Sequence, residues 1–317
     1  MEFDEIAKKR LKFLEDNYVP LIDYHLNNKC EIYLGDKINR TCRFCKKSEG
    51  EVTFKNKAHA IPEFTGNKIL IAHYECDICN SEFSRLMESH MANYMNLFHT
   101  ISQVKGKKGV PSFKTSQKKS RIDIETTHVN LEDHEGDTIT TLDEENKTIT
   151  IKAKRATYTP IAIYKCLTKM AITIMPEIEL QKFKNTIDWL NEKYHEKSPF
   201  DLKSLFTLFS VTPGINPFPF TSCILFKRKD DHKNDVPYML FLLAYGNFSF
   251  QIHLPLCIED KKLSNKALEL TYIPTPADGL VGSKIIARKR LDLNSKTQVK
   301  GEEETIIMSY ESKEELI

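Results

Sequence analysis

The stretch CRFCKKSEGEVTFKNKAHAIPEFTGNKILIAHYECDICN, residues 42–80, begins and ends with a Cys-x2-Cys pair. The pairs are Cys42/Cys45 and Cys76/Cys79, and 30 residues separate them. One Cys-x2-Cys turn places two thiolates at the separation that zinc needs, and two such turns complete a tetrahedron without an open position. We therefore expect these four cysteines to hold a structural Zn2+ that stabilises the fold.

The residues between the two pairs predict two strands joined by a loop. Residues 51–61 have strand character and contain His59 near their end. PEFTGN (62–67) contains a Pro and a Gly, as loops do, and residues 68–76 are a second apolar alternation. From residue 77 to 98, apolar residues recur every three or four positions, which predicts a helix.

This order of motifs resembles the HNH endonuclease family in its zinc-ribbon version. The resemblance is carried by the two Cys-x2-Cys pairs, by HAIPE at 59–63 and by the Asn80 that follows the second pair, and it covers about residues 40–100. It implies a ββα-metal fold that hydrolyses phosphodiester bonds of DNA with Mg2+ or Mn2+. Members with these Ile-Pro-Glu and Cys-Asn variants are similar to HNH effectors of bacterial anti-phage defence, in which the nuclease is joined to a sensor or partner domain.

The resemblance also assigns roles to two catalytic residues. A divalent metal can bind the scissile phosphate as Lewis acid, and a neutral histidine can take the proton of the attacking water. His59 is then the general base, and Asn80 holds the catalytic metal from the first turn of the helix. Glu63 is placed to order the loop beside His59, or simply follows a Pro in a turn.

Two positions depart from the family pattern. Family members carry Asp, His or Glu immediately before the base, whereas Ala58 cannot bind a metal. The middle Asn, expected about five residues before the third cysteine, falls at Ile71. His73 lies on the same strand face two residues further on, and Glu75 shares that face, so either is a candidate for the missing ligand. We expect Glu88, His90 and His99 in the helix to be ordinary surface residues.

A basic segment follows the predicted helix. Between residues 105 and 121 there are seven Lys or Arg residues and no acid, whereas the segment 123–145 has nine acids and no Lys or Arg. Lysine-rich segments contact phosphates without reading sequence. We expect a nucleic-acid contact led by Lys105, Lys107 and Lys108; the alternative is a solvated linker.

The rest of the chain indicates an α+β protein with a second α+β domain. A helix is expected at residues 3–19, a hairpin between 136 and 154, a buried helix from 159, an amphipathic helix over 176–194, and strands from about 203 onward. We divide the chain into an HNH nuclease module with its N-terminal helix and zinc ribbon (1–115), a charged linker and hairpin (116–155), and a C-terminal regulatory or interaction domain (156–317).

Composition limits the cellular setting and the partners. The net charge of +2 gives no whole-molecule argument for nucleic acid, so DNA as partner is inferred from the site. Without an apolar run of about 18 residues or a signal-peptide core, we expect no membrane association and a cytoplasmic location. Paired Cys-x2-Cys motifs also favour a reducing compartment. A regulatory protein or a second copy of the chain is a further expected partner.

Three hypotheses about function remain open at this point. The first is a metal-dependent HNH endonuclease that acts on DNA and is regulated by its C-terminal domain or a partner, with a role in anti-phage defence. The second is a zinc-ribbon module that binds nucleic acid or protein without catalysis, in which Ala58 and Ile71 mark a lost metal site. The third is a regulatory or structural partner protein, in which the second half of the chain is the working part.

Overall fold

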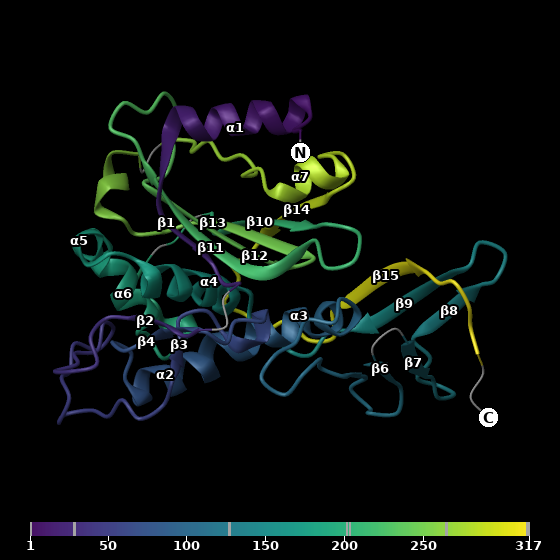
Figure 1. The fold of residues 1–317 in the computed structure, drawn as a ribbon. Helices are drawn as coiled ribbons and strands as arrows, with labels where there is room; N and C mark the ends of the chain where they lie inside the picture. The colour runs from purple at the N-terminus through teal and green to yellow at the C-terminus, as the bar shows by residue number, and fades with distance from the viewer. Residues whose placement is uncertain are drawn as a thin grey trace.

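The computed structural model describes residues 2–27, 30–125, 128–200, 202, 204–263 and 266–314. The predicted α+β class is confirmed, because helices alternate with four separate sheets (Figure 1). The helices are α1 (Glu5–Asn17), α2 (Asp77–Phe83), α3 (Ser89–Ile101), α4 (Pro160–Ile174), α5 (Glu177–Leu180), α6 (Lys184–Leu190) and α7 (Pro276–Val281). Short helical turns are η1 (Glu63–Thr65), η2 (Ser84–Glu88, a π turn), η3 (Gln181–Phe183), η4 (His195–Lys197) and η5 (Ile258–Leu263).

A six-stranded antiparallel sheet forms the body of the second half, in the order β1-β11-β12-β13-β10-β14. Helices α4 to α6 cover one of its faces, and α1 and α7 lie over the other (Figure 1). Its strands are β1 (Tyr18–His25), β10 (Phe206–Val211), β11 (Phe218–Arg228), β12 (Met239–Gly246), β13 (Phe248–His253) and β14 (Ala287–Asp292).

Three small sheets complete the fold. The first, in the order β2-β4-β3, contains the two strands that lie between the cysteine pairs, β3 and β4, and the orders of the others are β5-β6-β7 and β15-β9-β8. Their strands are β2 (Ile32–Leu34), β3 (Ala58–His59), β4 (Leu70–Ala72), β5 (Phe113–Lys114), β6 (Arg121–Glu125), β7 (His128–Glu132), β8 (Thr140–Asp143), β9 (Thr148–Lys154) and β15 (Glu303–Ser309). The predicted hairpin is β8–β9, and β15 extends it from the far end of the chain.

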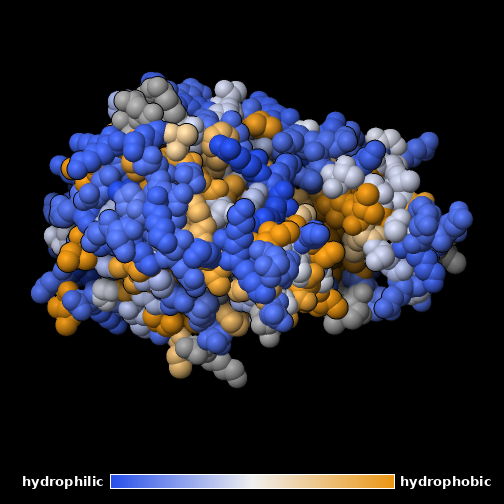
Figure 2. Space-filling view, turned by 90° about the horizontal axis from the view of Figure 1, so that it is seen from above, coloured by the Kyte–Doolittle hydropathy of each residue, from blue (hydrophilic) through white to orange (hydrophobic). Residues whose placement is uncertain are grey.

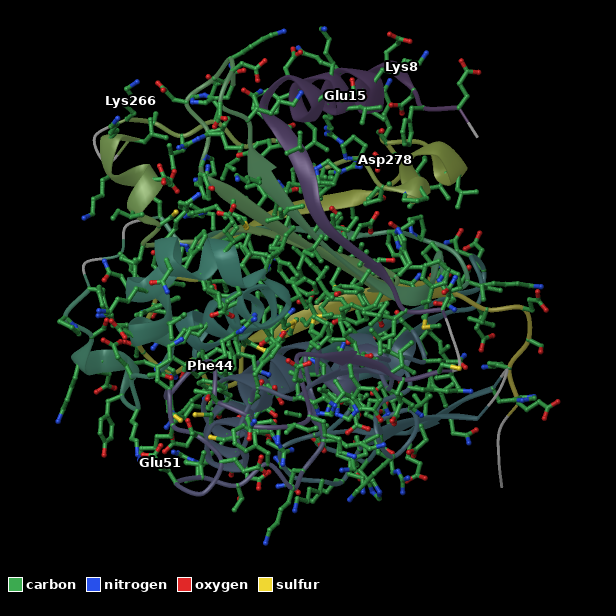
Figure 3. The ribbon with its side chains drawn as sticks, turned by 60° about the vertical axis from the view of Figure 1, so that its left-hand side comes forward. Lys8, Glu15, Phe44, Glu51, Lys266 and Asp278 are labelled. Carbon is green, nitrogen blue, oxygen red and sulfur yellow. The ribbon has the colours of Figure 1, made fainter. Side chains whose placement is uncertain are left out.

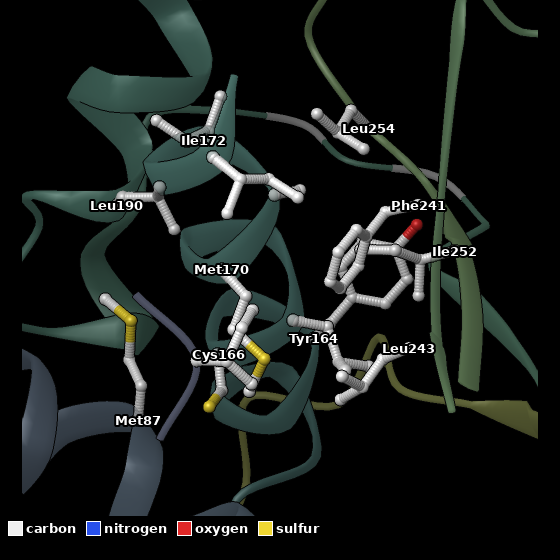
Figure 4. Close-up of a cluster of buried hydrophobic side chains, with 14 of the residues drawn as sticks. Met87, Tyr164, Cys166, Met170, Ile172, Leu190, Phe241, Leu243, Ile252 and Leu254 are labelled. Atoms are coloured by element: carbon white, nitrogen blue, oxygen red, sulfur yellow. The ribbon is translucent and has the colours of Figure 1, made fainter. Parts of the chain in front are cut away.

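Helix α4 is the centre of the molecule, because every one of its 15 residues is buried. Its apolar residues point to all sides, as the sequence predicts, and one side contacts β12 and β13 while another contacts η2 and α3. Figure 4 shows both contacts: Met87 lies beside Cys166 and Met170, while Tyr164 of the same helix faces Phe241. The cysteine-rich segment and the second half therefore share one hydrophobic core.

The N-terminal segment joins the sheet of the second half. Strand β1 follows α1 directly and pairs with β11 in antiparallel register, from Tyr18 opposite Arg228 to His25 opposite Ser222. Leu14 of α1 packs in the same small cluster as Phe226 and Leu240. The sequence analysis expected the helix but not this strand, and it grouped both with the HNH module. The domain boundaries at 115 and 155 stay a prediction.

One further difference concerns helix continuity. The amphipathic helix expected over 176–194 is broken into α5, η3 and α6, because Phe183, at φ −112° and ψ 22°, leaves helical geometry.

The face of the molecule over α1 is mostly hydrophilic (Figure 2). Within the described part of the chain, none of the helices has the length and apolar character to cross a bilayer.

Candidate active site and zinc cluster

The four cysteines of the two pairs meet in one cluster. The Sγ atoms of Cys42, Cys45, Cys76 and Cys79 all lie within 4.8 Å of one another, and Cys45 Sγ is 3.8 Å from Cys76 Sγ. Two sulfurs bound at about 2.3 Å to one tetrahedral zinc lie about 3.8 Å apart, so the donor set and its spacing fit Zn2+. Figure 3 shows sulfur atoms grouped between the labelled Phe44 and Glu51.

Arg43, in the first knuckle, anchors the zinc cluster to the end of α4. Its guanidinium donates hydrogen bonds to the carbonyl oxygens of Ile172, Thr173 and Met175, each at 2.8 Å. The last carbonyls of a helix have no partner within the helix, so Arg43 supplies their hydrogen bonds. Its positive charge also interacts favourably with the negative end of the helix dipole. The zinc cluster and the C-terminus of α4 are therefore held in a fixed relation.

His59 lies at the end of β3, and a buried asparagine shapes the loop that follows it. In the pairing of β3 with β4, Ile71 is opposite His59. Asn67, 1% exposed, donates to the carbonyl of Ile61 at 2.6 Å and accepts from the backbone N–H groups of Ile69 and Leu70 at 3.0 Å. Sequence reasoning sought a middle Asn at Ile71 and missed Asn67, although the Gly-Asn pair between two strands was a signal for a shaped turn.

His59 and Asn80 line the same pocket, whose volume is about 620 Å³. Asn80, Ser84 and Glu88 also line it, and their spacing of four residues places them on one face of the continuous helix formed by α2 and η2. Glu63, four residues after His59, lines the same pocket. Three lysines bring positive charge to the same pocket: Lys57, Lys68 and Lys107.

Burial favours the neutral form of the His59 imidazole. The side chain is 17% exposed, and burial lowers its pKa below the ordinary value, while the nearby Glu63 carboxylate raises it in part. Glu63 Oε2 lies 3.8 Å from His59 Nδ1 and 3.9 Å from Lys107 Nζ. A neutral imidazole in a polar pocket is able to accept a proton from water.

A lysine from the second half contacts the back of this site. Lys169 of α4 has its Nζ 3.0 Å from Glu75 Oε2, 3.7 Å from Glu88 Oε1 and 3.4 Å from the carbonyl oxygen of His59. Burial alone would lower the pKa of Lys169, but the two carboxylates outweigh it and raise the pKa, so the ammonium stays charged. Burial raises the pKa of Glu75 to about 7, and the charge of Lys169 opposes that rise.

His73 is not brought to the His59 pocket. It lines a neighbouring pocket of about 510 Å³, where its ring stacks on Tyr33. Glu75, the other reserve ligand, is fully buried against Lys169, and Ala58 is 1% exposed. The structure therefore places His59, Asn80, Glu63 and Glu88 in the lining of one pocket and His73 in another.

Of the three basic residues expected to lead a nucleic-acid contact, Lys107 lines the His59 pocket, and Lys105 and Lys108 flank it in the same loop. That loop lies close to η1: a Cβ on Gly106 would stand 3.4 Å from Phe64 Cα. The backbone of the lysine loop therefore lies directly beside the turn that follows His59.

The expectation that Glu88, His90 and His99 are surface residues is wrong. Glu88 lines the pocket, and His90 Nδ1 accepts a hydrogen bond from the Thr159 N–H at 3.0 Å. His99 is 3% exposed, lies 2.9 Å from the Tyr245 hydroxyl, and has its pKa lowered by burial to about 3. Helical periodicity identifies one buried face, but here α4 and the large sheet cover further faces.

Comparisons with known proteins agree with this geometry over one segment. Residues 42–96 match the family model described as HNH endonuclease. Neither the curated proteins nor the solved structures include a significant match to the chain. The matched segment runs from the first zinc cysteine through β3, β4 and α2 into α3, and so contains His59, Asn80 and the whole cysteine cluster. The chain therefore carries, over residues 42–96, an HNH endonuclease module of the four-cysteine, zinc-ribbon type.

Proposed function

We propose that this protein is a metal-dependent endonuclease that hydrolyses phosphodiester bonds of DNA at the His59 pocket. The observation that carries the proposal is the convergence of His59 and Asn80 on one polar pocket beside a closed cysteine cluster. The cysteines have no open coordination position for chemistry, so a reaction must use the neighbouring pocket. The HNH family match indicates a nucleic-acid substrate.

The residues of the pocket suit a hard divalent cation. The amide oxygen of Asn80 and the carboxylates of Glu63 and Glu88 are oxygen donors of the kind that Mg2+ and Mn2+ prefer, and Mg2+ sites commonly use only one or two carboxylates besides water and phosphate. When bound, the cation would supply Lewis-acid activation of the scissile phosphate. Ala58 leaves Asn80 as the first expected ligand.

The chain's own groups supply the remaining steps. His59, neutral because it is buried, takes the proton from the attacking water, and Glu63 beside Nδ1 stabilises the imidazolium that forms. The lysines of the pocket balance the charge of the phosphate backbone. Lys169 fixes the backbone of His59 from behind through its carbonyl.

Regulation by the second half or by a partner is a further part of the proposal. It is supported by Arg43 and Lys169, which tie both sides of the site to α4. Control by a protein partner or by a second copy of the chain stays a prediction. Action in anti-phage defence is proposed from the resemblance alone, and the cytoplasmic location stays a prediction.

The test is a cleavage assay on supercoiled plasmid with Mg2+, Mn2+ or EDTA. We compare the wild type with His59→Ala and with a matched control, His134→Ala, whose exposed side chain lies outside the site. Loss of a general base costs about 10²–10⁴-fold in rate. His59→Ala should lose cleavage to this extent while zinc content is retained, and His134→Ala should cleave normally.

The second candidate function is a zinc-ribbon module that binds nucleic acid or protein without catalysis. One observation favours it: within the described residues, the four cysteines are the only group of three or more His, Cys, Asp or Glu side chains close enough to hold a metal. This candidate predicts one zinc per chain, no binding of a second metal, and no cleavage with any of the metals.

A further inference from the structure

A second pocket adjoins the His59 pocket and shares two of its residues. It has a volume of about 510 Å³, and Asn56 and Lys57 line both pockets. A polymer bound with one phosphate at His59 would therefore pass over Asn56 and Lys57 into this second pocket. Apart from Lys57, the proposed cleavage reaction does not use the groups found there.

Two aromatic rings form one side of the second pocket. The rings of Tyr33 and His73 are stacked, with centroids 4.7 Å apart and planes 9° from parallel. The strands hold this arrangement, because β2 and β4 run parallel with Tyr33 opposite Ile71, and the His73 N–H donates to the Leu34 carbonyl at 2.9 Å. Tyr33 is nevertheless 48% exposed, so its ring is open to a ligand.

The charges of this pocket suit a nucleotide. Its lining has more cations than acids, since Lys37, Arg40, Lys55 and Lys57 stand against Asp36 and Glu75. Arg40 and Lys57 are already paired with Glu49 and Glu31, whereas the described structure gives Lys37 and Lys55 no ion pair. Aromatic rings beside lysines form the usual platform for a base together with its phosphate.

A buried carboxylate also belongs to the lining of this pocket. Glu75 lines the pocket, and although its Oε2 lies 3.0 Å from Lys169, its Oε1 has no hydrogen-bond donor among the residues that the structure describes. Native proteins seldom leave a buried carboxylate oxygen without a donor.

We infer that this second pocket binds an unpaired nucleotide of the DNA strand next to the phosphate at His59, with its base against the Tyr33–His73 stack. A base that is paired within a duplex does not present its face, so the pocket selects single-stranded or locally unpaired DNA. The inference rests on the proposed function for the adjacent phosphate site, and it adds the substrate class. A free mononucleotide has the same chemistry, and the experiment separates the two sources.

The experiment measures binding without cleavage. Full-length His59→Ala protein is titrated, by fluorescence anisotropy, into a labelled single-stranded DNA oligonucleotide and into a base-free oligomer with the same sugar-phosphate backbone. Two double variants are made in this His59→Ala parent. Tyr33→Ala removes the aromatic ring, and Tyr33→Phe is the matched control that keeps it. Zinc content and thermal midpoint verify that each variant is folded.

The expected result is about tenfold weaker binding of the oligonucleotide by Tyr33→Ala, since stacking of one base contributes about that factor or more. Tyr33→Phe should bind like its parent, and the base-free oligomer should not distinguish the variants. Equal oligonucleotide affinity of Tyr33→Ala and its parent would overturn the inference. A labelled blunt duplex and free dAMP are tested as further ligands. An affinity for the duplex that depends on Tyr33 would overturn the selection of unpaired bases. An effect of Tyr33→Ala on the binding of dAMP but not of the oligonucleotide would overturn the assignment to a DNA strand.

Failure of the proposed function remains distinguishable from failure of this inference. Tyr33-dependent binding of single-stranded DNA in a protein whose wild type cleaves no DNA would refute the nuclease while supporting the nucleotide pocket. Cleavage by the wild type with no effect of Tyr33→Ala on binding would support the nuclease and refute the nucleotide pocket.

Discussion

Lys169 of α4 pairs with Glu75, the residue immediately before the third zinc cysteine, at 3.0 Å in a site where neither side chain is exposed by more than 1%. Removal of one member of such a pair leaves a buried charge without compensation, which typically costs about 3–5 kcal/mol. This ion pair therefore links the second half of the chain to the HNH module through a contact that neither half makes alone.

Lys169→Met should be strongly destabilised, and Lys169→Met/Glu75→Gln should recover part of the loss, because the second change removes the uncompensated carboxylate. Urea unfolding of the wild type, both single variants and the double variant completes a double-mutant cycle. Additive effects of the two single changes would contradict a direct interaction between the residues.

Zinc removal should unfold the HNH module. The free energy of binding a structural zinc is part of the folding free energy of small zinc modules. Metal analysis should find one zinc per chain, and Cys79→Ala should lose it together with several degrees of thermal midpoint. Cys30→Ser, a change at an exposed cysteine outside the cluster, is the control that should retain both. Full zinc content in Cys79→Ala would contradict the four-cysteine assignment.

Asn67→Ala should destabilise the loop after His59. The change leaves two backbone N–H groups and one carbonyl without their side-chain partner. Each buried group that loses its hydrogen bond in this way costs about 1–3 kcal/mol of stability. We expect a loss of a few kcal/mol in the free energy of unfolding and slower cleavage. Asn67→Asp keeps the acceptor but loses the donor, so its stability should lie between Asn67→Ala and the wild type.

The pH dependence of cleavage should reflect the burial of His59. A general base must be neutral, so activity falls on acidification through its pKa, and burial lowers that pKa below the ordinary value of 6.5. The acid limb of kcat/KM should thus lie below pH 6.5. Glu63→Gln removes a carboxylate that raises the pKa of His59, so it should move the acid limb to lower pH still. An acid limb above pH 6.5 would contradict this environment.

Local sequence patterns were sufficient to predict the zinc cluster and the order of the elements around it, but the two strands are much shorter than expected, since β3 is Ala58–His59 and β4 is Leu70–Ala72. Cysteine spacing reports a local turn, and each turn is formed by a few residues, so Cys42 to Cys79 could be assigned without knowledge of the rest of the fold. The buried helix α4 was likewise predicted, since its apolar residues point in every direction. The pairing of β8 with β9 followed from their alternation and short turn.

What the sequence could not indicate depends on packing between distant segments. Lys169 reaches the site across 110 residues from His59, and a lone lysine in an apolar helix does not identify its partner. Glu88 looked like a surface residue because the burial of its helix face depends on α4. Strand β1 was missed because its partner, β11, lies about 200 residues away.

The role of His59 as the base that cleaves DNA is the central claim, and plasmid cleavage by the wild type and His59→Ala tests it most directly. With Mg2+ or Mn2+, the wild type should convert supercoiled plasmid to nicked or linear forms, and His59→Ala, with its zinc intact, should do so at least about 100-fold more slowly. Equal cleavage rates for the two proteins would contradict the claim.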